Sequence, residues 1–158
     1  MRKTGFTGTL IGTKENDKQL DLKHERCKSF SLSYNPEKPI LYSYAKITIG
    51  DRTIITDKAM WDTGATITVI SHATANQFDA TPNEVGTSIS ATDRSDSDIY
   101  LATIELPGGI VFHNAEVWDV DLSDHGAEVV IGMDIISRGK LVVETVYGVP
   151  MFTFSIEQ

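Results

Sequence analysis

The 158-residue chain is predicted to fold as an all-β protein with one or two short helices. From Ser29 onward, short runs alternate between apolar and polar residues, as half-buried strands do. Turn residues such as glycine, proline and aspartate separate these runs. Segments with helical spacing are short and few. With 158 residues, of which 41% are hydrophobic, a single domain can bury its own core.

Three pairs of runs are predicted to form β-hairpins. The runs "ILYSYAKITIG" and "DRTIITDKAM" meet at Gly50-Asp51, which is a turn-type sequence. The runs "DIYLATIEL" and "GIVFHNAEVWDV" flank "PGG". The last hairpin, "KLVVETVYGVPMFTFSIE", turns near Tyr147-Gly148 and places Phe152, Phe154 and Ile156 on one face of its final strand.

Two short helices are expected between these hairpins. Ser71 is a suitable cap for a helix over His72–Phe78, which ends before Pro82. A second helix is predicted over Met133–Arg138, with Gly139 as its C-terminal stop.

The first part of the chain differs from the rest. A short strand is predicted at Gly5–Ile11, followed by a polar segment of mixed charge that ends near Lys28. We therefore divide the chain into an N-terminal extension, residues 1–38, and a domain, residues 39–158. A pro-segment, an extra strand and a cloning remnant are all open interpretations of the extension.

Charge and composition exclude several classes of partner. The formal net charge is −8, and no long basic block is present, which argues against nucleic acid. No apolar run reaches the 18 or more residues of a membrane span, and the N-terminus lacks the apolar region of a signal peptide. Cys27 is the only cysteine, so no disulfide within the chain is possible. A cytoplasmic protein with no membrane partner is expected.

No metal or other cofactor is expected. The four histidines are scattered without the spacing of metal ligands. The acidic loop Asp119–Gly126 resembles a calcium loop only weakly, because Asp124 and Val130 stand where a glycine and an acid are needed. A solvated acidic loop is the simpler interpretation.

The stretch "AMWDTGATITVIS" places Asp62 inside an apolar run. A plain turn would explain Asp-Thr-Gly, since aspartate and glycine both favour turns. The setting argues for more, because the strand "IITDKAMW" enters the turn and the strand "TITVIS" leaves it. Asp62 is therefore expected to lie nearly buried at the base of a packed sheet, where a carboxyl is costly unless it has a task.

At this point the chain resembles the retroviral-type (retropepsin-like) aspartic proteases. "DTGAT", Asp62–Thr66, is similar to their active-site signature, and "EVVIGMDIIS", Glu128–Ser137, is similar to their hydrophobic-hydrophobic-glycine element. The resemblance covers roughly residues 39–157 and is strongest to the cellular and prokaryotic branch. It implies a single-domain closed β-barrel or sandwich that functions as a homodimer, with the second element crossing under the active-site loop.

The resemblance also implies the chemistry. Two aspartates about 3 Å apart share a proton and activate a water that attacks a peptide bond. Asp-Thr-Gly occurs once in the chain, so each subunit would supply one Asp62. Thr63 would hydrogen-bond across the two-fold axis, and Gly64 would offer its backbone to the substrate. The predicted catalytic set is therefore Asp62, Thr63 and Gly64, acting on a peptide or protein substrate.

Further substrate contacts are expected from residues around this loop and from a β-hairpin flap with its tip near Ser90–Arg94. They are Ala65, Thr66, Ser90, Ala91, Thr92 and Ile131. The terminal strand "PMFTFSIE" is the candidate for an interdigitated dimer sheet. Two other interpretations remain open: a catalytically silent module of the same fold that dimerises or binds peptides, and an unrelated acidic β-domain.

Overall fold

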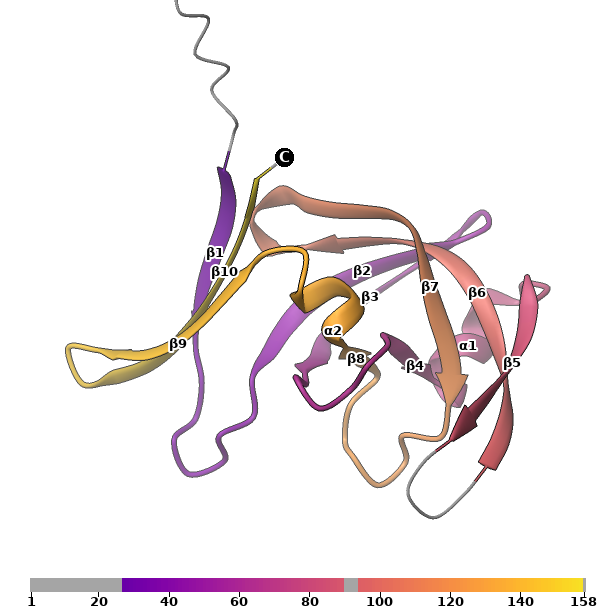
Figure 1. Ribbon diagram of the computed structural model, residues 1–158, viewed down its shortest axis with the longest axis horizontal. Coiled ribbons are helices and arrows are strands. Elements are labelled where there is room, and N and C mark those ends of the chain that lie inside the picture. Colours follow the sequence, from indigo (N-terminus) through magenta and orange to yellow (C-terminus); the bar gives the residue numbers. More distant parts are fainter. Residues whose placement is uncertain (1–26, 90–93, 158) are drawn as a thin grey trace, which may run out of the picture.

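The computed structural model describes residues 27–89 and 94–157, and within them it confirms the all-β class with two short α-helices (Figure 1). The main sheet has the order β2 (Tyr42–Ile49), β3 (Arg52–Trp61), β8 (Val129–Ile131), β4 (Val69–Ser71), β7 (Ile110–Val120), β6 (Arg94–Leu106) and β5 (Glu84–Ile89). Because β2 also pairs with β6, six of these strands close into a barrel. β5 lies outside the ring and, among the described strands, pairs only with β6.

The three predicted hairpins are confirmed. β2 and β3 are joined by Gly50-Asp51, and β6 and β7 by a 3-10 turn at Pro107–Gly109. β9 (Lys140–Val146) and β10 (Val149–Glu157) are joined by Tyr147-Gly148. The φ angles of these two turn residues are 49° and 82°, as the tight turns of two-residue hairpins require.

β9 and β10 belong to a second, three-stranded sheet with β1 (Cys27–Ser33), in the order β1-β10-β9. Figure 1 shows β1 and β10 side by side, while the β9–β10 hairpin projects away from the barrel. β10 is thus the central strand, and β1 and β9 of the same chain occupy its two edges. The expectation that "PMFTFSIE" interdigitates with a second subunit is therefore wrong, because no edge of this strand is open.

β1 falls within the segment expected to be an N-terminal extension. It pairs with β10 along its whole length, from Cys27 opposite Glu157 to Ser33 opposite Met151. This part of the extension is therefore an added strand of the fold. The strand predicted at Gly5–Ile11 lies outside the described residues, and the division at residue 38 stays a prediction.

Aromatic side chains join the three-stranded sheet to the barrel. Phe152 and Phe154 of β10 are fully buried and pack on Trp61 of β3, with ring centroids 5.9 and 4.9 Å from the indole. Phe30 of β1 meets the same indole edge-on at 5.8 Å. Trp61 Nε1 donates a hydrogen bond to Ser43 Oγ at 2.9 Å, so its polar atom is satisfied. The last residue of β3 is therefore held by both sheets.

The first helix, α1 (His72–Phe78), has the predicted bounds. It begins after Ser71, whose Oγ accepts a hydrogen bond from the N–H of Thr74 at 3.1 Å. It ends at Phe78, and the next residue, Asp79, has a φ of 50°. In the described part of the chain, neither helix has the length or the apolar character needed to cross a bilayer.

The second helix, α2 (Met133–Ile136), ends two residues earlier than predicted. Gly139 does not adopt the left-handed conformation of a helix stop. Its role is close packing instead, because a Cβ there would lie 2.4 Å from the carbonyl oxygen of Ser155 on β10.

Candidate active site

The loop that follows β3 carries the Asp-Thr-Gly sequence. Asp62 is half-buried, while Thr63 and Gly64 are exposed. The N–H of Gly64 donates a hydrogen bond to Asp62 Oδ1 at 2.8 Å, and a Cβ at position 64 would lie 3.1 Å from that oxygen. Glycine therefore lets the backbone approach the carboxylate. The expectation of a nearly buried acid is wrong for the single chain, because the tip of the loop next to Asp62 is open to solvent.

β8 lies between the two strands that flank this loop. It pairs parallel with β3 and antiparallel with β4, which gives the crossing that the resemblance implies. The N–H of Asp62 donates to the carbonyl oxygen of Ile131 at 3.0 Å, and the N–H of Met133 donates to that of Ala65 at 2.8 Å. Backbone hydrogen bonds thus fix the loop on both sides of its tip.

A buried hydroxyl ties the loop to α2. Thr68 is fully buried, and its Oγ1 donates to Asp134 Oδ1 at 2.8 Å and accepts from the N–H of Gly132 at 3.1 Å. A Cβ at position 132 would lie 2.4 Å from the carbonyl oxygen of Ile67, so glycine is required there. Sequence reasoning did not single out Thr68 or Asp134. The signal was the one that identified Asp62, a polar residue within an apolar run.

The residues predicted to contact substrate differ in their exposure and surroundings in the structure. Thr66 is exposed on the loop, and Ala65 is half-buried against a small apolar cluster that contains Val130. Ile131 is fully buried in the barrel core and offers the loop only its carbonyl group. Its selection as a substrate-contacting side chain is therefore corrected. The side chain of its neighbour Val130 belongs to the cluster beside Ala65.

β5 and the first half of β6 form the hairpin predicted to cover the site. The two strands pair in a continuous antiparallel register from Glu84 to Ile89. Three of the residues predicted at its tip, Ser90, Ala91 and Thr92, lie outside the described residues. The hairpin itself is therefore confirmed, and the contacts of its tip stay a prediction.

The base of this hairpin rests on the barrel through Gly86. A Cβ at this position would lie 2.4 Å from the indole ring of Trp118 on β7 and 2.7 Å from Cδ1 of Ile99. Glycine is therefore needed for the hairpin to lie flat on the Trp118 ring. This packing explains why the single glycine of the predicted flap stands in the stem.

A hollow opens beside Asp62, on the side that faces the three-stranded sheet. Its walls come from the segment before β2, the end of β3 and β9, and both Asp62 and Thr63 line it. Ile40 and Val143, which also line it, are 40% and 52% exposed. Apolar surface next to the Asp-Thr-Gly loop is thus open to solvent in the single chain.

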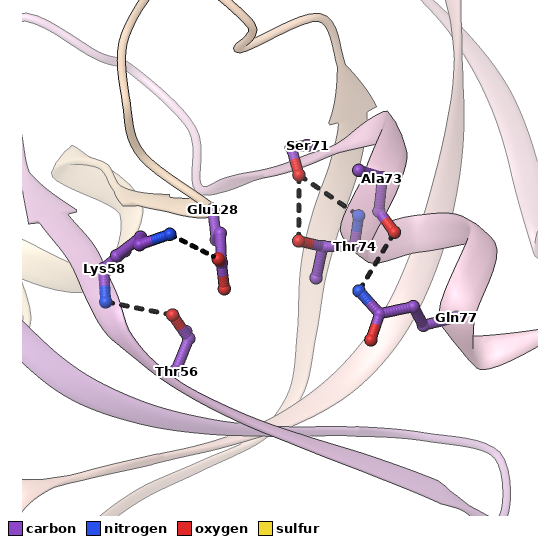
Figure 2. A network of polar contacts seen from close by, with 7 residues as sticks. All are labelled: Thr56, Lys58, Ser71, Ala73, Thr74, Gln77 and Glu128. Atoms are coloured by element: carbon purple, nitrogen blue, oxygen red, sulfur yellow. Dashed lines mark hydrogen bonds and ion pairs between the residues drawn. The ribbon is translucent and has the colours of Figure 1, made fainter.

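A polar network anchors the segment that leads into β8 (Figure 2). Lys58 Nζ lies 3.1 Å from Glu128 Oε1, and the Lys58 N–H donates to Thr56 Oγ1 at 2.9 Å. The Thr56 hydroxyl and then the Lys58 ammonium lower the pKa of Glu128 below its ordinary value of 4.5, against a smaller opposing effect of burial. The same contact with Glu128 raises the pKa of Lys58. The network therefore supports the strand whose Ile131 carbonyl holds Asp62.

These features agree with a scan against protein-family models. Residues 45–138, more than half of the chain, match the family described as "gag-polyprotein putative aspartyl protease". The chain belongs to this aspartyl protease family. A search of curated proteins found no match. Within residues 27–89 and 94–157, no three His, Cys, Asp or Glu side chains gather as metal ligands would.

A search of solved structures found proteins that are described as proteases or protease-like domains. A retropepsin-like aspartic protease from Rickettsia conorii is 14% identical, with a TM-score of 0.53 over 83% of this chain and 94% of that chain. The simian foamy virus (mac) protease is 20% identical, with a TM-score of 0.42 over 61% and 92%. The retroviral protease-like domain of Ddi1 from Leishmania major is 15% identical, with a TM-score of 0.39 over 70% and 91%. At these identities, the likeness to the Rickettsia protein shows a common fold.

Proposed function

We propose that this chain is an aspartic endopeptidase whose active site forms between two identical subunits, each supplying one Asp62. The observation that supports the proposal is the geometry of the Asp62 loop. Three backbone hydrogen bonds to the β8–α2 segment and a buried threonine hold it, while its tip stays exposed. A rigid loop with a half-buried carboxyl beside an exposed tip suits a dyad that is completed by a second copy.

The reaction follows from the pairing of two carboxyl groups. Held about 3 Å apart, they cannot both ionise, so one acts as a base while the other stays protonated. The base takes a proton from a water, and the oxygen of that water attacks the carbonyl carbon of the peptide bond. The protonated carboxyl then gives its proton to the leaving amine. No covalent intermediate with the protein forms.

Each neighbour of Asp62 has a part in this proposal. Thr63, exposed beside the hollow, faces the second subunit and joins the two loops. Gly64 already donates its N–H to Asp62 Oδ1 at 2.8 Å, so it orients the carboxyl group. The β5–β6 hairpin would close over the extended substrate. Thr66 and the apolar cluster beside Ala65 would contact substrate side chains.

The test compares Asp62→Asn with Asp57→Asn, a matched change of an exposed aspartate on β3. Purified proteins are incubated with denatured casein or a peptide library at mildly acidic pH, with and without a pepstatin-type inhibitor. Cleavage by the wild type and by Asp57→Asn, and none by a folded Asp62→Asn, supports the proposal. A folded, dimeric wild type that cleaves nothing would favour the catalytically silent module instead.

Concentration and pH provide an independent check. Since no single chain has a complete site, activity should rise more steeply than linearly with protein concentration at high dilution. A singly protonated pair is needed, so activity should follow a bell-shaped pH profile with its peak on the acidic side of neutrality. Sedimentation that shows a fully active monomer would contradict the shared dyad.

A further inference from the structure

Within the described residues, the two outer strands of the three-stranded sheet are β1 and β9, and neither pairs with a further strand on its outer side. The edge of β1 is partly covered, because its first half lies against the turn at Pro107–Gly109. A Cβ on Gly108 would lie 2.3 Å from the carbonyl oxygen of Ser29, and Lys28 Nζ donates to the carbonyl oxygen of Gly109 at 2.8 Å. β9 pairs with β10 on one side, and no described strand lies on the other. An open edge offers unpaired N–H and C=O groups to another strand.

The ladder determines which groups face this open edge. The carbonyl oxygen of Pro150 on β10 accepts from the N–H of Tyr34 at 3.1 Å, so it points away from β9. In an antiparallel ladder these directions alternate along each strand. The β9 residues opposite Pro150, Phe152 and Phe154 therefore direct their backbone groups outward. They are Thr145, Val143 and Leu141.

The β9 sequence "KLVVE", residues 140–144, is complementary to itself when two copies run antiparallel. We propose that β9 pairs with β9 of a second copy of this chain, with Val142 at the two-fold axis. In this register Lys140 lies opposite Glu144 of the partner subunit, and Leu141 lies opposite Val143 of the partner subunit. This proposal rests on the proposed function, and it names the surface through which the two Asp62 loops meet.

Few registers are compatible with the ladder. Residues whose backbone N–H and C=O groups point to the open edge must pair with residues of the same kind in the second copy. The two strands can therefore shift only in steps that keep Leu141, Val143 and Thr145 paired among themselves. A shift by one such step in either direction would place Lys140 or Glu144 opposite a valine. The register with Val142 on the axis sets opposite charges against each other twice, which stabilises cross-strand pairs.

The proposed contact between the two β9 strands, called the seam below, lies beside the proposed active site. Leu141 and Val143 line the hollow that Asp62 and Thr63 line, so the strand with the open edge and the loop lie beside the same hollow. Pairing of two β9 strands would cover the half-exposed Val143 and join the two sheets into one continuous sheet across the axis. A second copy is therefore the occupant that completes both the edge and the site.

The two charged residues have no competing partner in their own chain. Neither Lys140 nor Glu144 takes part in the ion pairs found among residues 27–89 and 94–157. Opposite them on β10 stand Ser155 and Met151, which are uncharged. Exchanging these charges should therefore leave the fold of the single chain unchanged.

The first experiment exchanges the charges. Lys140→Glu alone puts two acids face to face at both ends of the seam, and Glu144→Lys alone does the same with two bases. Each variant should raise the dimer dissociation constant by about tenfold or more in sedimentation analysis. An equimolar mixture of the two should recover dimers and cleavage, because the mixed dimer restores both opposite-charge pairs. The double variant should recover both without mixing.

The second experiment tests the register by cross-linking, in a Cys27→Ser background. Val142→Cys should form a disulfide between subunits under an added oxidant, because the two Cβ atoms face each other at a non-hydrogen-bonded pair. Thr145→Cys, on the same strand but far from its own copy in this register, should not. Non-reducing electrophoresis with a dilution series separates the two outcomes.

The results separate this proposal from the proposed function. If the wild type dimerises and cleaves, but Lys140→Glu dimerises as tightly and Val142→Cys does not cross-link, the dimer uses another surface and the seam is wrong. If the wild type is a monomer at every concentration tested, both the seam and the shared dyad are wrong. Recovery in the mixture together with the Val142→Cys cross-link supports the seam.

Discussion

Replacement of Thr68 by valine should destabilise the protein strongly, although the two side chains have nearly the same shape. Thr68 is fully buried, and its hydroxyl satisfies both Asp134 Oδ1 and the N–H of Gly132. Loss of the hydroxyl leaves the buried amide of Gly132 without a partner, at about 1–3 kcal/mol, and removes a hydrogen bond from the half-buried carboxylate of Asp134, at about 1.5–3 kcal/mol. Since the added methyl group recovers part of this, we expect a loss of about 2–4 kcal/mol. The free energy of unfolding of a typical domain is only about 5–15 kcal/mol.

The measurement is urea unfolding followed by tryptophan fluorescence, at one protein concentration for all variants. Thr66→Val is the matched control, because it makes the same chemical change two residues earlier at an exposed position, where an effect within about 0.5 kcal/mol is expected. A Thr68→Val protein as stable as the wild type would refute the role of this hydroxyl. Equal losses in both variants would show that the hydroxyl-to-methyl change, rather than burial, is responsible.

Three further predictions concern the surroundings of the site. Glu128→Gln should lower the free energy of unfolding at neutral pH. The difference from the wild type should disappear as the pH falls through the lowered pKa of Glu128, below 4.5, because protonation removes the same charge from the wild type. Urea midpoints across pH test this, and a constant gap would contradict it. Gly86→Ala should tilt the β5–β6 hairpin away from Trp118, and it should raise KM for peptide cleavage while the free energy of unfolding changes little. Cleavage kinetics and urea unfolding curves test this. A lower free energy of unfolding with an unchanged KM would show that the glycine is only structural. Asp96→Asn combined with Asp98→Asn should weaken any preference for basic substrate side chains, and unchanged cleavage profiles would show that these acids only keep the hairpin soluble.

Local features of the fold could be read from the sequence because each is set by a few neighbouring residues. Gly50-Asp51 and Tyr147-Gly148 stand where tight turns need them, and Ser71 caps α1 as its side chain predicts. The Asp-Thr-Gly loop was found because it places an acid inside an apolar run, where an acid is costly unless it has a specific contact. The Gly132 element was found through its resemblance to the protease family.

Features that depend on contacts between distant segments could not be read in this way. β1 is a short run beside a charged segment, and it is the contacts of Phe30 with Trp61, Phe152 and Phe154 that place it in the core. The order β1-β10-β9 places the last strand in the centre, which its own sequence does not indicate. β8 is buried on both faces, so alternation could not show that Val130 faces the cluster beside Ala65 while Ile131 faces the barrel core.

The three-stranded sheet links the proposed seam to the proposed catalytic residue. Phe152 and Phe154, which hold Trp61 directly before Asp62, lie opposite Val143 and Leu141 of β9. The strand with the open edge, β9, and the strand whose phenylalanines pack on Trp61, β10, are therefore neighbours in one sheet. Close-packed side chains transmit small displacements to their neighbours. Pairing of two β9 strands would thus restrain the phenylalanines of β10 that pack on Trp61. The contact that brings two Asp62 residues together would then also make each Asp62 loop more rigid.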